Sequence, residues 1–158
     1  IDPGVLIYIA DKEHLNVNGV NNLINKKSGV AGISQLSSDM RDLELAAAEG
    51  NEKALLALNM YAYKVKKFIG SYIAALNGLD LLIFTGGVGE NDHKMRAMIC
   101  SDMENLGIVF DFKANDGVKG KDIVISKPES RVKVMAITTD EEFVIASDTR
   151  YIIEHHTV

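Results

Sequence analysis

Apolar side chains recur at spacings of three and four residues through the middle of the chain, over residues 51–76. The stripe consists of Leu55, Leu58, Ala62, Val65, Ile69, Tyr72 and Leu76. This period predicts one long amphipathic helix, and the following Asn77-Gly78 is a common way to end a helix. Such a helix serves either the core of a domain or an interface between helices, and we favour the core.

The pattern changes at residues 81–84, Leu-Leu-Ile-Phe, where a continuous apolar run predicts a strand buried on both faces. Residues 85–89, Thr-Gly-Gly-Val-Gly, predict a tight turn, because glycine lets the backbone turn or approach a ligand. Helical spacing returns over residues 91–106. A strand, a glycine turn and a helix N-terminus together present N–H groups to an anionic or nucleotide ligand.

The common phosphate and dinucleotide motifs do not match this turn. Asp92 stands where the third glycine of a dinucleotide fingerprint would be, and no Gly-Lys-Ser/Thr follows as in a Walker loop. The local pattern therefore leaves two interpretations open: a ligand site, or a tight strand-to-helix turn that binds nothing.

Capping residues and periodicity predict a mainly helical N-terminal part. Asp2-Pro3 has an N-cap residue followed by proline at the first helical position. A later helix begins either with Ser38 and Asp42 together or with Asp39 alone. The expected elements are a helix at 3–13, a turn at 16–19, a helix at 20–27, a glycine-rich non-core segment at 30–34 and a helix at 40–49.

The C-terminal part is expected to contain most of the strands. They are predicted at 107–111, 122–126 and 132–137, with an exposed polar loop at 113–120. A last helix runs to about residue 154 and begins with a capping box of Thr139 and Glu142. Because ligands bind at the carboxyl ends of strands in open α/β sheets, the two strand-to-helix junctions could share one site.

Composition narrows the class of protein. The 158 residues suit one domain, and a net charge of −5 argues against a general nucleic-acid or membrane-surface binder. No apolar run approaches the ~20 residues that cross a bilayer. The single Cys100 fits a reducing compartment and a buried apolar position. Ile1-Asp2-Pro3 is no translation start, so we expect a piece of a longer protein.

Four stretches of the sequence resemble the acetate kinase family in order and spacing. They are Asp2-Pro3, Ser37-Ser38-Asp39-Met40-Arg41, the Phe-Thr-Gly-Gly-Val-Gly-Glu-Asn run at 84–91, and residues 134–149 with their Thr-Thr-Asp-Glu-Glu. Several motifs in register are more specific than one glycine turn, and together they span the whole chain. The resemblance implies an α/β fold, a ribonuclease-H-like domain of the actin, Hsp70 and sugar kinase type, with a mixed sheet flanked by helices.

The resemblance also implies a function. Residues 1–158 would form a single C-terminal nucleotide-binding domain, without its N-terminal partner domain, of an enzyme that reversibly transfers the γ-phosphoryl group of ATP to acetate. The products would be acetyl phosphate and ADP, and Mg²⁺ or Mn²⁺ would assist. The residues implied in nucleotide binding are Asp39, Met40, Arg41, Gly87, Val88, Gly89, Glu90, Asn91 and Met95, and Glu141 is implied as the metal ligand.

No catalytic residue is expected within the chain, because the family's acetate pocket and catalytic groups would precede Ile1. The chain alone is therefore expected to be inactive. Met40 and Thr138 depart from the family pattern, where an aromatic residue and a proline are usual, but neither change removes a ligand type. Taken without the resemblance, Arg41 is more typical of a solvated helix residue and Glu141 of a charge that complements a helix N-terminus.

The family further implies a cytoplasmic homodimer that pairs through this domain. Two alternatives remain open at this point. One is a propionate or butyrate kinase, since the acyl pocket that separates these enzymes would lie outside the chain. The other is a non-catalytic dimerisation or binding module, in which the glycine turn is purely structural.

Overall fold

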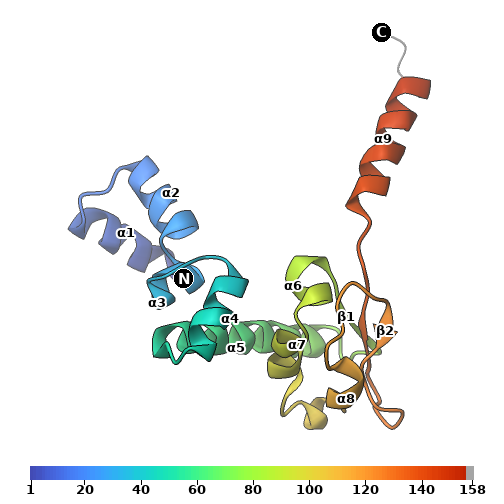
Figure 1. The fold of residues 1–158 in the computed structure, drawn as a ribbon. Coiled ribbons are helices and arrows are strands. Elements are labelled where there is room, and N and C mark those ends of the chain that lie inside the picture. Colours follow the sequence, from blue (N-terminus) through green and yellow to red (C-terminus); the bar gives the residue numbers. More distant parts are fainter. Residues whose placement is uncertain (156–158) are drawn as a thin grey trace. The chain divides into compact units, whose positions relative to one another are not determined.

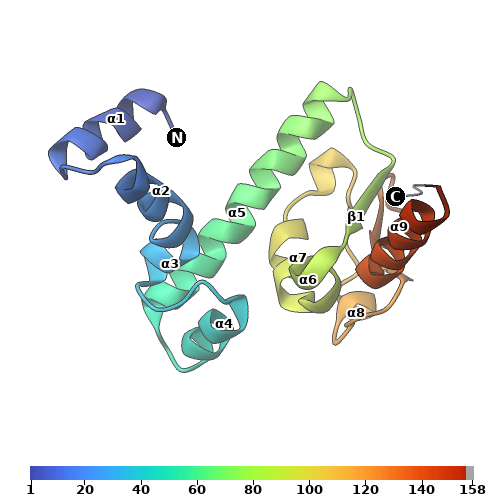
Figure 2. The ribbon, with the colours of Figure 1, turned by 90° about the horizontal axis from the view of Figure 1, so that it is seen from above.

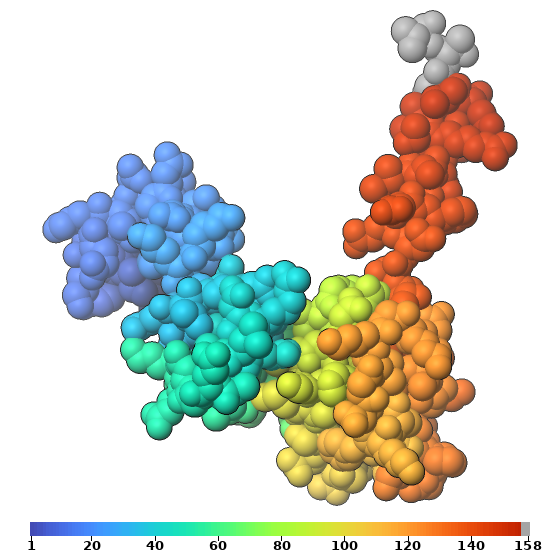
Figure 3. Space-filling model, viewed as in Figure 1, coloured from blue at the N-terminus to red at the C-terminus, as the bar shows by residue number. Residues whose placement is uncertain are grey.

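The computed structural model describes residues 1–155, which are drawn in colour in Figures 1 and 3. Its contacts divide the chain into two compact units, Ile1–Phe68 and Ile69–Val158. The boundary falls within helix α5 (Glu52–Ala75), and each unit is described by itself. The expectation of a single domain over residues 1–158 stays a prediction.

The first unit is helical. It contains α1 (Pro3–Lys12), α2 (Val17–Lys26), α3 (Gly29–Ser34), α4 (Met40–Ala48) and the first part of α5. The predicted start of α1 is confirmed, because the Asp2 carboxylate accepts a hydrogen bond from the Gly4 N–H at 2.7 Å. An N-cap acid and a proline act within one turn, so sequence alone locates this start.

Two expectations for the first unit are wrong. The expected turn at 16–19 is instead the beginning of α2, because the Asn16 side chain accepts a hydrogen bond from the Gly19 N–H at 2.8 Å and caps the helix. The glycine-rich residues 30–34 lie in α3, and Ser34 is buried. The Ser34 hydroxyl accepts a hydrogen bond from the Leu36 N–H at 3.2 Å, so this short helix takes part in the packing.

Helix α5 confirms the long helix predicted over residues 51–76. Asn51 begins it and accepts hydrogen bonds from the N–H groups of Lys53 and Ala54, at 3.0 and 3.1 Å. The buried residues of α5 are Ala54, Ala57, Leu58 and Ala62. The large apolar residues exposed on it or directly after it are Leu55, Leu56, Met60, Tyr63, Phe68, Tyr72 and Leu76. The predicted stripe is therefore only partly core.

The second unit contains a three-stranded mixed sheet in the order β1-β3-β2. Strand β1 (Leu81–Phe84) pairs in parallel with β3 (Lys133–Ala136), and Phe84 lies opposite Ala136. Strand β2 (Ile123–Val124) pairs with β3 in the antiparallel direction. The predicted mixed sheet is confirmed, and so are the strands expected at 81–84, 122–126 and 132–137.

Two expectations about strands are wrong. Strand β1 is not buried on both faces: Leu81 and Ile83 are 40% and 44% exposed, whereas Phe84 is 8% exposed. Successive side chains of a strand face opposite sides. The side of Leu82 and Phe84 is half-buried to buried, and the side of Leu81 and Ile83 is exposed. The strand expected at 107–111 is reduced to an isolated bridge between Phe110 and Ser126.

Helices follow the strands of the second unit. They are α6 (Gly86–Asn91), α7 (His93–Cys100), the 3₁₀ helix η1 (Glu104–Leu106), α8 (Phe112–Asn115) and α9 (Glu141–His155). The expected glycine turn is wrong, since α6 is a helical segment that follows β1 directly (Figure 2). The helix expected at 91–106 is interrupted, because Asp92 caps α7 by accepting from the Met95 N–H at 2.8 Å. The loop expected at 113–120 begins within α8 and includes the buried Asn115.

The core of the second unit is apolar apart from two buried polar side chains, Arg96 and Asn115. Its apolar members are Phe84, Met95, Ile99, Cys100, Met103, Ile108, Phe110, Ile125, Val132, Val134 and Ala136. Burial of Cys100 confirms its predicted apolar position. No helix among residues 1–155 combines the length and the apolar character that crossing a bilayer would require.

Candidate functional site

The two strand-to-helix junctions of the second unit lie together. Strands β1 and β3 are parallel neighbours, so their carboxyl ends share one edge of the sheet. At this edge the Ile137 N–H donates to the Phe84 carbonyl at 2.9 Å. Helix α6 follows β1, and residues 137–140, which we call the connecting segment, lead from β3 to α9. The predicted proximity of the two junctions is confirmed.

The three glycines of α6 are favoured at their positions for different structural reasons. Gly86 has φ +70°, a backbone conformation that side chains rarely adopt. A Cβ added at Gly89 would lie 3.0 Å from the carbonyl carbon of Phe84, so close packing against the end of β1 favours glycine at this position. A Cβ added at Gly87 would meet nothing within 4 Å. A Cβ at Gly86 would also meet nothing within 4 Å, but Gly86 is only half-exposed and its conformation already favours glycine, whereas Gly87 is exposed. Gly87 is therefore the glycine of α6 whose backbone is most open to a ligand.

The end of α6 is tied to the connecting segment through Glu90. The Thr139 N–H and hydroxyl both donate to Glu90 Oε2, at 2.9 and 3.3 Å. The Asn91 amide donates to the Gly87 carbonyl at 3.1 Å and to Glu90 Oε1 at 3.3 Å. Side chains of Glu90 and Asn91 are thus already engaged with the protein around α6.

Arg96 is fully buried and donates a hydrogen bond to the backbone of α6. Its guanidinium donates three hydrogen bonds of 2.8 Å, to the carbonyls of Gly89 and Val118 and to Asn115 Oδ1. Burial lowers the Arg96 pKa, because desolvation disfavours the charged form, and the nearby Asp92 carboxylate opposes this shift. Oδ2 of Asp92 is buried without a hydrogen-bond partner among the described residues.

Sequence analysis did not identify Arg96. A usable signal was present: Arg96 stands one turn after Asp92 and one turn before Cys100, next to the apolar Met95 and Ile99. An arginine on the buried face of a helix needs partners for its donors. Those partners come from segments up to 22 residues away, which the sequence does not indicate.

The start of α9 differs from its prediction. Asp140 accepts a hydrogen bond from the Phe143 N–H at 2.8 Å and caps the helix, so the expected capping box of Thr139 and Glu142 is wrong. Thr139 is instead engaged with Glu90. Glu141 is exposed in the first turn of α9.

Asp122 holds the residue before Thr139. The Thr138 N–H and hydroxyl donate to Asp122 Oδ1, both at 2.8 Å. Both hydrogen bonds stabilise the charged form of Asp122 and so lower its pKa. The bond from the Thr138 backbone N–H has the larger effect. Two carboxylates, each accepting from two donors of one threonine, therefore fix the connecting segment.

The other predicted site residues lie in the first unit, at the start of α4. Asp39 is the N-cap, and its Oδ1 accepts from the Arg41 N–H at 2.9 Å, so Asp39 rather than Ser38 with Asp42 begins the helix. The Arg41 guanidinium also bonds both carboxylate oxygens of Asp39, at 3.1 and 2.7 Å. This side-chain hydrogen bonding to Arg41 lowers the pKa of Asp39 from 3.8 to about 2. Met40 stands between them as the first residue of α4.

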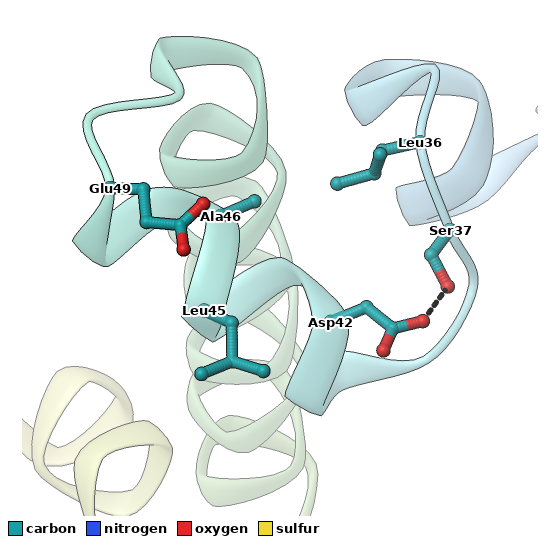
Figure 4. A pocket seen from close by; sticks show the side chains of 6 residues that line it. All are labelled: Leu36, Ser37, Asp42, Leu45, Ala46 and Glu49. Atoms are coloured by element: carbon teal, nitrogen blue, oxygen red, sulfur yellow. Dashed lines mark hydrogen bonds between the residues drawn. The ribbon is translucent and has the colours of Figure 1, made fainter.

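A shallow pocket lies beside this helix start and was not predicted (Figure 4). Its volume is about 350 Å³, and it is lined by Leu36, Ser37, Asp42, Leu45, Ala46 and Glu49. The Ser37 hydroxyl donates to the Asp42 carboxylate at 2.6 Å, and a dashed line marks this hydrogen bond in Figure 4. With two carboxylates and no cationic side chain in its lining, this pocket does not suit a phosphate.

Comparison with known proteins identifies the family. The sequence profile of the acetokinase family matches residues 1–147. The chain belongs to the acetokinase family. Among curated members, the acetate kinases of Porphyromonas gingivalis and Bacteroides thetaiotaomicron are 55% and 54% identical over 154 residues, which is 98% of this chain and 39% of each relative. The chain thus spans about two fifths of the length of these acetokinases.

Solved structures of the family agree. The crystal structure of Porphyromonas gingivalis acetate kinase matches with a TM-score of 0.90 and 55% identity, over 97% of this chain and 38% of that chain. An acetate kinase from Entamoeba histolytica gives a TM-score of 0.86 at 34% identity, over 96% and 40% of the two chains. A propionate kinase from Francisella tularensis gives 0.82 at 38% identity, over 94% and 37%. The resemblance and the predicted fold class are confirmed.

The site residues themselves fall into three groups within this acetokinase chain. Residues 87–91 lie in α6, and Glu141 lies at the start of α9, so the second unit holds both at one sheet edge. Residues 39–41 lie in the first unit. The Met95 side chain is buried in the core, and its role in an adenine pocket stays a prediction.

Proposed function

We propose that this chain is the nucleotide-binding part of an acetate kinase. In the reaction, a carboxylate oxygen of acetate attacks the γ-phosphorus of ATP, and the bond to the β,γ-bridging oxygen breaks, which gives acetyl phosphate and ADP. The observation that carries the proposal is the glycine-rich α6 at the shared carboxyl edge of two parallel strands, in a chain of the acetokinase family. Ligands of open α/β sheets bind at such edges.

The chain's own residues would bind and orient the nucleotide. The open space at Gly87 lets adenosine approach the backbone, and Val88, Gly89, the backbone of Glu90, and Asn91 complete the segment. Met95 is buried in the core one helical turn after Asn91, and from there it would line an adenine pocket. Each group acts by position and charge, as phosphoryl transfer requires.

Residues 39–41 are proposed as a second contribution to nucleotide binding. A planar guanidinium suits phosphate oxygens, and Arg41 is exposed at a helix start. Its fork is held in place by Asp39, so a phosphate would have to share Arg41 with that carboxylate.

Mg²⁺, or Mn²⁺ in its place, would be bound with Glu141. An exposed carboxylate has the oxygen chemistry that these ions prefer. Among residues 1–155 no three His, Cys, Asp or Glu side chains gather to enclose a metal ion. The ion would therefore be held mainly by nucleotide phosphates and water, with one protein carboxylate, which is usual for Mg²⁺. When bound, it would neutralise charge on the transferring phosphoryl group.

Partners and activity follow from the same proposal. We propose homodimerisation through α5, supported by its row of exposed apolar side chains.

The residues that bind acetate and stabilise the transferring phosphoryl are proposed to lie in the rest of the full-length protein, so the 158-residue chain alone should not form acetyl phosphate. The likeness to a propionate kinase makes a propionate-specific enzyme the second candidate.

A pair of glycine variants tests the nucleotide site in the full-length protein. Gly87→Val should raise the Kd for ADP about tenfold or more, because the added side chain occupies the space at α6. Gly70→Val is the matched control, since a Cβ at Gly70 in α5 also meets nothing within 4 Å. Calorimetric titration measures both Kd values. Equal ADP affinity in Gly87→Val and the unmodified protein would contradict the proposed site.

A further inference from the structure

We propose that Glu90 is a positioning residue that fixes the start of α9, and with it Glu141, against α6. The inference rests on the proposed function, in which α6 meets the nucleotide and Glu141 meets the metal. Its structural basis is the pair of hydrogen bonds from the Thr139 N–H and hydroxyl to Glu90 Oε2, at 2.9 and 3.3 Å. These bonds connect positions 49 residues apart in the sequence.

Every backbone N–H between β3 and Asp140 is bonded to a different element. Ile137 donates to the Phe84 carbonyl at the end of β1, Thr138 donates to Asp122, and Thr139 donates to Glu90. Residues 137–139 are therefore attached one after another to three separate parts of the second unit. Of these three hydrogen bonds, only the one to Glu90 involves α6. Glu90 therefore links the proposed nucleotide segment to the start of α9, the helix that carries Glu141.

The contacts of the Glu90 carboxylate favour positioning over direct nucleotide contact. Oε2 accepts two donors from Thr139, and Oε1 accepts one from the Asn91 amide. A carboxylate next to a phosphate would repel it. The Glu90 carboxylate instead accepts hydrogen bonds from the N–H and the hydroxyl of Thr139, just before α9. The Glu90 backbone carbonyl also accepts from the Gly120 N–H at 3.2 Å, which keeps the residue itself in place.

The arrangement predicts a specific functional consequence. If Glu90 is shortened, α6 keeps its own support from Arg96, so the nucleotide segment stays formed. The start of α9 loses its attachment to α6, so Glu141 would no longer be held in place relative to the proposed nucleotide segment. Groups that orient a metal ligand typically change metal affinity about 10–100-fold when they are removed. Metal-assisted binding should weaken while binding of the metal-free nucleotide remains.

The test uses the full-length protein and its Glu90→Ala, Glu90→Gln and Thr139→Ser variants. Calorimetry measures the Kd for ADP with and without Mg²⁺, and hydrogen exchange followed by mass spectrometry reports on peptides covering residues 137–143. Glu129→Ala is the control for charge loss, because Glu129 is an exposed acid in the turn before β3. Melting temperatures verify that each variant is folded, which is expected because Thr139 is exposed and Glu90 only half-buried.

We expect Glu90→Ala to speed exchange at residues 139–141 and to raise the Kd for Mg²⁺·ADP, each about tenfold. The Kd for metal-free ADP should stay within about twofold. Glu90→Gln, which keeps one acceptor oxygen, should have a smaller effect, and Thr139→Ser, which keeps both donors, should resemble the unmodified protein. Glu129→Ala should change neither quantity.

Two results would overturn the positioning role while leaving the proposed function intact. In the first, Glu90→Ala changes neither the effect of Mg²⁺ on the Kd for ADP nor the rate of hydrogen exchange at residues 139–141. The other is an equal loss of affinity for metal-free and Mg²⁺-bound ADP, which would make Glu90 a direct nucleotide ligand. An unmodified full-length protein that binds no nucleotide would overturn the proposed function, and this inference with it.

Discussion

The two strand-to-helix junctions at the sheet edge are held in opposite ways. Helix α6 is fixed by Arg96, whose guanidinium is removed from water and bonds the Gly89 carbonyl. The start of α9 is fixed at the surface, where Asp122 and Glu90 accept hydrogen bonds from exposed threonines. A buried polar network is costly to disrupt, whereas water competes for surface hydrogen bonds. The comparison indicates that α6, the proposed nucleotide segment, is held by interactions that are harder to disrupt than those that hold the start of α9, where the proposed metal ligand Glu141 lies.

The largest expected effect comes from removing the buried support of α6. Arg96→Met should destabilise the protein by about 3 kcal/mol, because three acceptors lose their donor: the buried Asn115 Oδ1 and the part-buried carbonyls of Gly89 and Val118. Arg96→Lys keeps the charge but not the three-way fork, so it should recover only part of the loss. Urea unfolding measures both. A cost below about 1 kcal/mol for Arg96→Met would remove the proposed contrast between the two junctions.

A smaller effect separates two glycines of the same helix. Gly89→Ala should destabilise the fold by about 1–3 kcal/mol, because its Cβ would lie 3.0 Å from the Phe84 carbonyl carbon. Gly87→Ala should leave stability within about 0.5 kcal/mol, since its Cβ has open space. Thermal unfolding of the two variants provides the comparison. Equal destabilisation would mean that Gly87 is also a packing glycine and would weaken its assignment to the ligand.

The smallest expected effect concerns the surface junction and depends on pH. Hydrogen bonds from Thr138 lower the folded-state pKa of Asp122 below its ordinary value of 3.8. Its contribution to stability is therefore complete above that value and is lost as the pH falls through the lowered folded-state pKa. The free energy of unfolding of the unmodified protein should exceed that of Asp122→Asn by a constant amount near neutral pH, and this difference should disappear in strong acid. Arg96 stays charged throughout this range, so the buried junction should contribute no matching change.

Denaturation of both proteins at a series of pH values measures this difference. An advantage over Asp122→Asn that grows as the pH falls below 3.8 would contradict the assigned direction of the Asp122 pKa.

Local features could be predicted from the sequence, and distant pairings could not. The helix starts at Asp2 and Asp39 follow from caps that act within one turn. The closeness of the two strand-to-helix junctions followed from the usual position of ligand sites at the carboxyl ends of strands in α/β sheets. The hydrogen bonds of Glu90 to Thr139 and of Arg96 to Val118 join residues 49 and 22 positions apart, and no local pattern specifies them.

Errors of prediction have the same origin. Glycines 86, 87 and 89 predict a turn, because glycine lets the backbone turn, but they lie in a short helix. Gly89 packs close to the end of β1, and its carbonyl accepts a hydrogen bond from Arg96. Thr139 was expected to cap α9, but Glu90 takes both of its donors, and Asp140 becomes the cap. Tertiary partners overrode local preference in each case.

Paramagnetic broadening by Mn²⁺·ADP tests the central claim most directly. The claim is that α6 and the start of α9 together receive the nucleotide and its metal. In the NMR spectrum of the isotope-labelled chain, Mn²⁺·ADP should broaden the amide signals of residues 86–91 and 139–142 first, and Mg²⁺·ADP should shift the same signals without broadening. The signal of Gly70 in α5 serves as the internal reference. Broadening that begins elsewhere in the second unit, or that leaves residues 86–91 and 139–142 unchanged at saturating Mn²⁺·ADP, would contradict the account.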